Sequence, residues 1–548
     1  MNSIQNNLYG RAWWFLAIGI LLNIPGLWLD IMEPDGALYA TIAKHIVLHR
    51  DWLNLFGDGH DWLDKPHFPF WMAALSYKLF GITGFGYKLP AFLFWLAGIY
   101  YTYLTARDLF NRPTAILSIT IYAVALHSTL FNFDVRAEPY LTTCIVGAVW
   151  HMLRASRGAW LHLLPAALFA ACGVMTKGIF VLATIGGGWV IYWIIAGQWQ
   201  EFLNYRWWIF AALCLLFIMP ELYSLYTQFD LHPEKIVFGR THVSGIRFFF
   251  WDSQFGRFFN TGPIKGSGSP AFFLHTTLWA FLPWSAALTG AVIYLVRFDR
   301  EREPARWIVY GSTLITFALF SFSGFQLPHY IVILFPYFAI ISAFFLQSGA
   351  SAKVLKALTI IQVITLLATG VAIGWLLFRT GIDSKIQAGI ITLVLIVAGL
   401  FLRGRSMLES FLIKGYAVAA VMYVFLFFFF YPFLLQYQAG RQAAVDIPQS
   451  HQAVPAAIYG VLSYSFEFYA PQDVQVVRNQ QALGEFLANK PCYLFTSKTI
   501  ADSLLHSGLK ASTVAEKPYY RITRLKPAFI NQKTRSDVTE ARSLLYVN

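Results

Sequence analysis

The chain has 548 residues, of which 57% are hydrophobic and only 13% are charged. An average soluble domain carries about 25% charged residues, so this composition excludes a soluble cytosolic enzyme and a disordered chain. A net charge of +13 could indicate nucleic-acid binding, but Lys and Arg fall mostly in short loops between apolar runs, as membrane orientation requires. We therefore predict a mainly α-helical, polytopic membrane protein with no nucleic-acid partner.

Runs of about 17–25 apolar residues indicate membrane-spanning helices. The sequence predicts about 13 of them. Their ranges are 12–29, 85–104, 113–132, 139–153, 160–176, 178–196, 207–225, 271–296, 307–322, 330–347, 357–378, 387–402 and 412–435. The first run lacks a small-residue cleavage site, so we expect an uncleaved anchor rather than a signal peptide.

Basic residues of alternate loops set the predicted orientation. With a cytoplasmic N-terminus, all of them fall on the cytoplasmic face. They are Arg107, Arg112, Arg154, Arg157, Arg206, Arg297, Arg300, Arg302, Arg306, Lys353, Lys356, Arg403, Arg405 and Lys414. An odd number of spans then places the tail outside. The sequence thus predicts a transmembrane domain over 1–436 and an extracytoplasmic domain over 437–548.

Three outer segments are too long or too polar to be simple turns. Loop 30–84 contains two amphipathic stretches, Leu38–Leu48 and Phe68–Phe80, which we expect to be helices at the membrane interface. The second segment is loop 226–270, and the third is the tail. In the tail we predict strands at 454–460, 465–469, 473–477, 492–496 and 519–522 and a helix at 481–488, which together indicate a small α/β domain.

Ionisable side chains gather at the outer ends of the predicted spans. The spans themselves are nearly free of them, apart from His127 and His151, which argues against an ion-coupled transporter. Acids beside bases at one membrane surface suit a reaction on a membrane-held anionic substrate, although each residue alone is also consistent with a solvated loop charge. The group comprises Glu33, Asp35, Asp64, Lys65, His67, Asp134, Arg136, Glu138, Lys177, Glu221, Arg240, His242, Arg247, Arg257 and His329.

The order of short motifs after the first span is specific. These motifs are Glu33-Pro34-Asp35, Tyr39-Ala40, Asp51-Trp52-Leu53, Asp64-Lys65-Pro66, Lys88-Leu89-Pro90, Thr176-Lys177-Gly178, Leu282-Pro283-Trp284-Ser285 and Leu327-Pro328-His329-Tyr330. In this order they resemble the bacterial glycosyltransferase 39 family, which is dolichyl-phosphate-mannose-protein mannosyltransferase-like and related to the lipid A aminoarabinose transferase. The resemblance covers residues 10–345 by ordered motifs.

The resemblance implies a GT-C helix bundle and an inverting transferase that takes a sugar from a polyprenyl phosphate. By the same resemblance, Asp35 activates or orients the acceptor, Lys65 holds the donor phosphate, and Lys177 is a second cation. Asp64 occupies the acidic position that contacts a metal ion in some relatives. The resemblance therefore implies a divalent metal as a possible cofactor and no other cofactor. Glu138, with Asp134 and Arg136, matches an acidic second outer loop.

The chain departs from the family pattern at several positions. Gly36 and Leu38 replace an acid and an arginine, His67 replaces a proline, and Glu221 replaces a tryptophan. The histidine expected in aminoarabinose enzymes is missing from Gly266–Ser269. These departures weaken the expectation of a metal site and of aminoarabinose specificity. The scattered histidines His60, His67 and His275 are alternative ligands, although such residues are more often interfacial.

Loop 240–265 interleaves basic and aromatic residues. This composition suits a phosphate with an isoprenoid chain, because Arg binds phosphate in a bidentate manner. We select Arg247 as a third phosphate ligand. An interfacial amphipathic helix has the same composition, so both interpretations remain open.

Together these patterns predict an integral-membrane hexosyl- or pentosyltransferase of the bacterial inner membrane. Its acceptor is a hydroxyl or phosphate on a protein, a lipid A-like glycolipid or a surface polysaccharide. The alternatives are a lipid-linked-sugar flippase without transfer activity and a non-catalytic scaffold that presents the tail.

Overall fold

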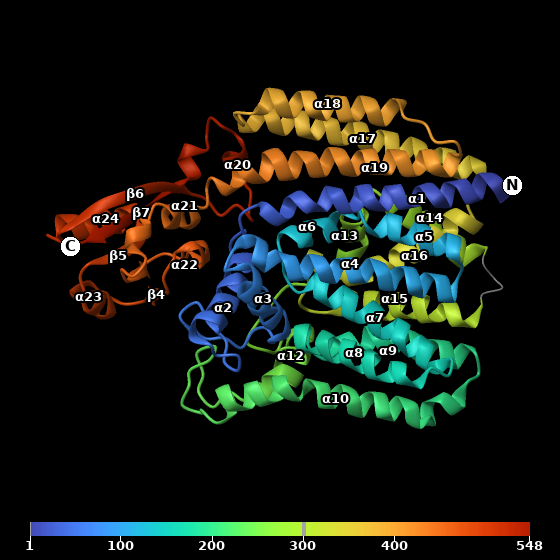
Figure 1. Cartoon of the computed structure of the whole chain (residues 1–548), viewed down its shortest axis with the longest axis horizontal. Helices are drawn as coiled ribbons and strands as arrows, with labels where there is room; N and C mark the ends of the chain where they lie inside the picture. Colours follow the sequence, from blue (N-terminus) through green and yellow to red (C-terminus); the bar gives the residue numbers. More distant parts are fainter. Residues whose placement is uncertain (1, 299–302) are drawn as a thin grey trace.

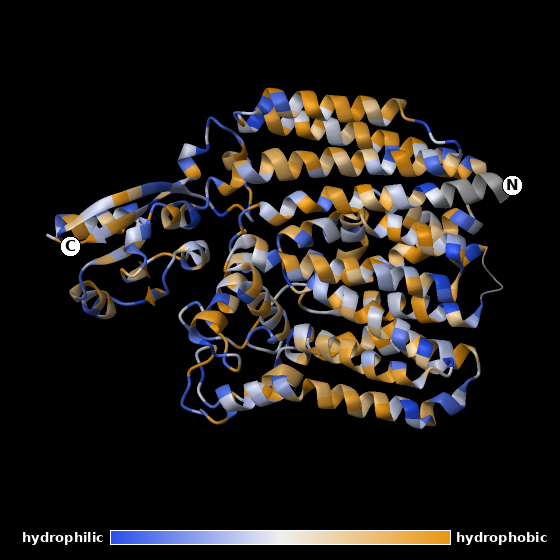
Figure 2. Cartoon of the chain, viewed as in Figure 1, coloured by the Kyte–Doolittle hydropathy of each residue, from blue (hydrophilic) through white to orange (hydrophobic). Residues whose placement is uncertain are grey.

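The computed structural model describes residues 2–298 and 303–548, so Arg300 and Arg302 lie outside the described residues. Long helices run side by side along one direction, and a small sheet lies beyond one end of this bundle (Figure 1). The N-terminus lies at the opposite end (Figure 1). Apolar residues cover the helices along most of their length, whereas polar residues gather at the two ends of the bundle and around the sheet (Figure 2).

The bundle confirms a multi-span membrane protein. In the part of the chain that the structure describes, eight helices are long and apolar enough to cross a membrane, or nine if one bent pair counts as a span. Three more apolar helices have 10–17 residues, and the count of about 13 stays a prediction. The bundle helices are α1 (Asn2–Asn23), α4 (Gly84–Leu109), α5 (Arg112–Tyr122), α6 (Leu126–Phe133), α7 (Glu138–Ser156), α8 (Leu163–Lys177), α9 (Phe180–Ile195), α10 (Tyr205–Leu225), α13 (Phe272–Ala280), α14 (Ser285–Arg297), α15 (Trp307–Phe322), α16 (Phe335–Ser348), α17 (Ala352–Thr380), α18 (Lys385–Phe401), α19 (Met407–Phe425) and α20 (Tyr431–Leu435).

Two of the predicted spans are broken helices. The run 113–132 forms α5 and α6, which bend by 54° relative to each other, and the run 271–296 forms α13 and α14. Non-helical backbone is tolerated inside a membrane protein where neighbouring groups bind the freed carbonyls. Here Tyr423 donates to the Val124 carbonyl at 2.8 Å, and the Leu126 amide donates to the Leu282 carbonyl at 2.9 Å. One hydrogen bond therefore joins the two breaks, and a side chain of α19 binds a freed carbonyl at the first of them.

Both amphipathic stretches of the first outer loop are helical, as predicted. Helix α2 (Asp35–His49) and helix α3 (Phe68–Phe80) lie at the sheet end of the bundle (Figure 1). A short hairpin, β1 (Phe56–Gly57) and β2 (His60–Asp61), connects them. The second outer loop contains the π-helix η4 (Tyr226–Asp230), α11 (Gly245–Arg247), the π-helix η5 (Phe248–Asp252) and α12 (Phe255–Phe258), and the 3₁₀ helix η7 (Pro328–Leu334) precedes α16.

The tail forms a five-stranded mixed sheet in the order β4-β3-β5-β7-β6. Strand β3 (Ala456–Tyr459) runs parallel to β4 (Val474–Val477) and β5 (Cys492–Ser497), and β7 (Glu540–Val547) runs antiparallel to β5 and β6 (Ala511–Tyr519). The helices are α21 (Ala439–Val445), α22 (Tyr464–Tyr469), α23 (Gln480–Ala488), α24 (Lys498–His506) and α25 (Pro527–Ile530). The strands predicted at 454–460, 473–477 and 492–496 and the helix at 481–488 are thus confirmed.

Two predictions in the tail are wrong. Residues 465–469 form helix α22, because Ser463 caps its first turn by accepting a hydrogen bond from the Phe466 amide at 3.4 Å. Their alternating aromatic pattern mimics a strand. Of the strand predicted at 519–522, only Tyr519 lies in a strand, as the last residue of β6, and 520–522 follow outside the sheet. The residues of β6 are mostly exposed and lack hydrophobic alternation, so the sequence pattern did not indicate this strand.

Candidate functional site

A cavity of about 180 Å³ collects most of the predicted site residues. It lies where α2, α7, α8 and η7 meet the outer loops, so residues far apart in the sequence share one space. Its polar lining consists of Asp35, Tyr39, Asp64, Lys65, Arg136, Glu138, Lys177, Arg257, His329 and Tyr330.

Asp35 is the first residue of α2 and pairs with Arg136. The distance from Asp35 Oδ2 to Arg136 Nη1 is 2.7 Å, and Arg136 Nη2 lies 3.1 Å from Asp134 Oδ2. Burial acts to lower the pKa of Arg136, but the two carboxylates outweigh it and raise that pKa. A Cβ at Gly36 would lie 3.0 Å from Asp134 Oδ1, so this departure from the family pattern lets Asp134 approach α2.

Asp64 binds two cations at once. Lys65 Nζ lies 2.8 Å from Asp64 Oδ2, and Arg257 from the second outer loop pairs with Asp64 Oδ1. Burial acts to raise the pKa of the Asp64 carboxyl, but Lys65 and Arg257 hold it below its ordinary value. Burial, followed by the charge of Arg257, lowers the pKa of Lys65. Asp64 is therefore ionised and holds both cations at the cavity wall.

A third ion pair completes the lining. Lys177, the last residue of α8, lies 2.8 Å from the carboxylate of Glu138, the first residue of α7. His329 Nε2 lies 3.8 Å from the same carboxylate oxygen, and Lys177 Nζ lies 3.8 Å from the centre of the Tyr330 ring. The pair joins two helix ends and directs a second ammonium group toward the cavity.

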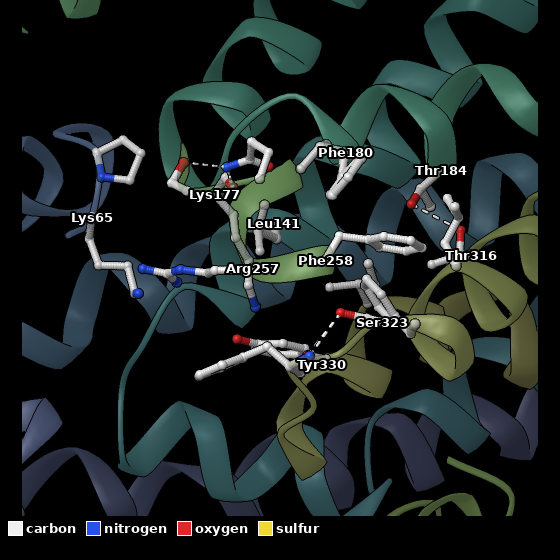
Figure 3. A pocket seen from close by; sticks show the side chains of 18 of the residues that line it. Lys65, Leu141, Lys177, Phe180, Thr184, Arg257, Phe258, Thr316, Ser323 and Tyr330 are labelled. Carbon is white, nitrogen blue, oxygen red and sulfur yellow. Dashed lines mark hydrogen bonds between the residues drawn. The ribbon is translucent and has the colours of Figure 1, made fainter. Parts of the chain in front are cut away.

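A second cavity of about 100 Å³ adjoins the first and is mostly apolar (Figure 3). The two cavities share Asp64, Lys65, Lys177, Arg257, Phe325 and Tyr330. Beyond them the second cavity is lined by the mainly apolar set Pro66, Leu141, Phe180, Val181, Thr184, Phe258, Thr316, Leu319, Phe320 and Ile333, together with the polar Ser253, Gln254 and Ser323. Three cationic side chains thus stand between a polar chamber and an apolar one, which is the arrangement that a phosphate bearing a hydrocarbon chain requires.

Four of the predicted site residues, Glu33, Asp134, Glu221 and Arg247, line neither of these two cavities. Glu33 is buried against the tail, and Glu221 is fully buried, with its carboxylate 3.0 Å from both the amide nitrogen and Nδ1 of His67. Arg247 has a 74% exposed side chain, 3.9 Å from Asp252. Arg257, on the same loop, lines both cavities instead.

The sequence signal for Arg257 was incomplete, because the composition of this loop does not distinguish its arginines. Tyr39 and Tyr330 stand inside the motifs quoted above, but those motifs assign them no role. All three acquire their places in the cavity from tertiary packing.

The donor set does not fit a divalent cation. Both oxygens of Asp64 contact cationic side chains, and both ring nitrogens of His67 are bonded, to Glu221 and to the Leu53 carbonyl. Within residues 2–298 and 303–548, no group of three or more His, Cys, Asp or Glu side chains could hold a metal ion. Positive charge at this site comes from Lys and Arg.

Comparison with known proteins confirms the resemblance. Residues 64–223 match the family model described as dolichyl-phosphate-mannose-protein mannosyltransferase. The chain is 26% identical over 319 residues to undecaprenyl phosphate-alpha-4-amino-4-deoxy-L-arabinose arabinosyl transferase 1 of Pseudomonas fluorescens, covering 56% of this chain and 52% of that protein. It is 29% identical over 334 residues to the corresponding transferase of Pseudomonas aeruginosa, covering 58% and 56%. The matched region thus spans about half the length of these curated relatives.

The fold is that of a solved structure. The crystal structure of ArnT from Cupriavidus metallidurans bound to undecaprenyl phosphate matches with a TM-score of 0.78 at 18% identity and covers 98% of both chains. The expected architecture, a bundle of membrane-spanning helices with a small α/β tail domain, is therefore confirmed.

Proposed function

We propose that this chain, whose residues 64–223 match the dolichyl-phosphate-mannose-protein mannosyltransferase family, is an integral-membrane glycosyltransferase with a polyprenyl-phosphate sugar donor. The observation that carries the proposal is the group of Lys65, Lys177 and Arg257 between a polar and an apolar cavity. The phosphate binds these cations, the isoprenoid chain occupies the apolar side, and the sugar lies in the polar chamber beside Asp35.

The proposed reaction is an inverting displacement at the anomeric carbon. Asp35 orients the acceptor hydroxyl or phosphate and takes its proton where there is one. The bond from the anomeric carbon to the phosphate oxygen breaks, and Lys65, Lys177 and Arg257 stabilise the negative charge of the departing polyprenyl phosphate. Arg136 holds Asp35 in place during the attack.

The names of the relatives suggest the donor. We propose undecaprenyl phosphate-α-4-amino-4-deoxy-L-arabinose, with a lipid A-like glycolipid as the acceptor and a protein or a surface polysaccharide as alternatives. We further propose a bacterial inner-membrane location, a cytoplasmic N-terminus, a catalytic domain over 1–436 and an extracytoplasmic domain over 437–548. The sheet lies at the end of the bundle where α2 is found (Figure 1), and α2 contributes Asp35 and Tyr39 to the cavity, which supports this orientation.

The test uses purified full-length protein in detergent with this donor, a panel of hexosyl and pentosyl polyprenyl phosphates, and lipid A. Release of polyprenyl phosphate by the wild type, and not by Asp35→Asn, supports the proposal. Lack of release with every donor, together with movement of lipid-linked sugar across reconstituted vesicles, identifies a flippase instead.

A further inference from the structure

The tail binds the segment that leads into Asp35. The Gln438 side chain donates to the Ile31 carbonyl at 2.9 Å and accepts from the Glu33 amide at 2.7 Å. The Tyr469 hydroxyl accepts from the Ile31 amide at 2.8 Å. Three hydrogen bonds from side chains of the last part of the chain thus fix the backbone just before α2 begins.

Glu33 continues this contact from the other side. Its Oε1 accepts hydrogen bonds from the Ser463 hydroxyl at 3.1 Å and from the Ser465 amide at 2.5 Å. These donors belong to the start of α22, so Glu33 supplies a carboxylate to the N-terminal end of a helix in the tail. An anion at this end of a helix is favourable, because it binds otherwise unpaired amides.

Lys44 binds the other end of the same helix. Lys44 is 3% exposed, and its ammonium group lies 2.8–3.2 Å from four backbone carbonyl oxygens, among which it shares its three protons. The carbonyls are those of Glu467, Phe468, Ala470 and Gln472. Glu33 and Lys44 therefore hold α22 at both ends, with an anion at its start and a cation at its end.

We propose that α22 positions the catalytic carboxylate, and that Glu33 and Lys44 are the positioning residues through which it acts. This inference rests on the proposed function of Asp35. Because Glu33 is anchored to α22 just before Asp35, loss of the anchor shifts the start of α2 relative to the cavity. A displacement of about 1 Å costs about 100-fold in rate when it misaligns a reacting group. Donor binding is spared, because Lys65, Lys177 and Arg257 lie outside α2.

The experiment compares Glu33→Ala and Glu33→Gln in the full-length protein with undecaprenyl phosphate-α-4-amino-4-deoxy-L-arabinose and lipid A. Glu33→Ala is expected to lower kcat by about 10- to 100-fold while leaving the KM for the donor unchanged. Glu33→Gln is expected to restore most of the loss, because its amide oxygen still accepts from Ser465. Glu485→Gln, a change on α23 at an exposed position, is the control and should match the wild type.

Hydrogen–deuterium exchange provides a readout that does not depend on activity. Glu33→Ala should speed exchange of the amides at 35–40, and Glu33→Gln should not. If the wild type shows no transfer, the proposed function is wrong. If exchange in Glu33→Ala is unchanged, the positioning role of Glu33 is wrong, whatever the activity of the wild type. If the wild type is active and Glu33→Ala has a normal kcat, the positioning role is wrong but the proposed function stands. If Glu33→Ala does not fold, Ser463→Ala removes one of the two bonds to Glu33 together with the cap of α22, and it should speed exchange at 35–40 in the same direction.

Discussion

The guanidinium of Arg136 lies 2.7 Å from the carboxylate of Asp35. This contact places a fixed cation beside the proposed base and sets the direction in which its free oxygen points. It also joins the first outer loop to the short loop before α7, although two predicted spans lie between them in the sequence.

Asp35→Asn tests the role of the carboxylate. The amide keeps the shape of the side chain but cannot take a proton, so kcat should fall by about 10²- to 10⁴-fold. Polyprenyl phosphate release measures the rate, and an unchanged thermal midpoint shows that the variant is folded. Near-normal turnover would remove Asp35 from the mechanism.

Arg257→Met is expected to weaken donor binding. Hydrogen bonds to charged groups contribute about 1.5–3 kcal/mol, so the KM for the donor should rise by about 10- to 100-fold. Arg247→Met is the matched control from the same loop, because its exposed pair with Asp252 contributes only about 0–1 kcal/mol. Equal effects of the two substitutions would contradict the assignment of Arg257 to the cavity.

The sequence predicted elements better than it predicted contacts. Long apolar runs and ordered motifs indicated the helices, the two outer amphipathic stretches, and the outer-end location of Asp35, Lys65 and Lys177. Composition could not distinguish Arg257 from Arg247, since only folding brings one of them to Asp64. The sequence alone did not explain why Glu221 replaces a tryptophan. In the structure Glu221 pairs with His67, which is itself a departure from the family pattern.

Glu221→Ala should act on stability. The substitution leaves the buried His67 amide and ring without their acceptor, and removing one partner of a buried pair costs about 3–5 kcal/mol. A lower unfolding midpoint in detergent is therefore expected, whereas Glu234→Ala, at an exposed position, should not change it. If Glu221→Ala has a normal unfolding midpoint but has lost transfer activity, Glu221 acts in the site rather than in stability.

The contact between α2 and α22 should depend on pH. Burial raises the pKa of Glu467 to about 7. His45 lies 3.4 Å from both Glu467 and Asp473; burial acts to lower its pKa, but Asp473 and Glu467 raise it overall. Both side chains therefore bind protons more tightly in the folded state than in the unfolded state. Their contribution to the stability of the fold is present at low pH and is lost as the pH rises through about 7.

Neighbouring groups set the limits of this window. The hydrogen bond to His45 lowers the pKa of Asp473 to about 2, so the contribution of Asp473 to the stability of the fold is lost only in strong acid. Burial lowers the pKa of Lys44 to about 8 in the folded state. Above pH 8 the folded state therefore binds fewer protons at Lys44 than the unfolded state does, and the stability rises again with pH. His49, on the same helix face, pairs with Asp473 at 3.0 Å. Exchange of the α22 amides should quicken between pH 5 and 8 after correction for intrinsic exchange, and pH-independent protection would refute this expectation.

The pairing of each cavity cation with a carboxylate has a consequence for turnover. On the proposed function, the donor phosphate draws Lys65 and Arg257 away from Asp64, and Lys177 away from Glu138, so its affinity reflects an exchange of partners rather than attraction to free positive charge. Added salt should then weaken donor binding little, because few bulk counterions are released. After the proposed transfer, the same carboxylates would compete for the cations that hold the polyprenyl phosphate, and this competition would favour its departure into the bilayer.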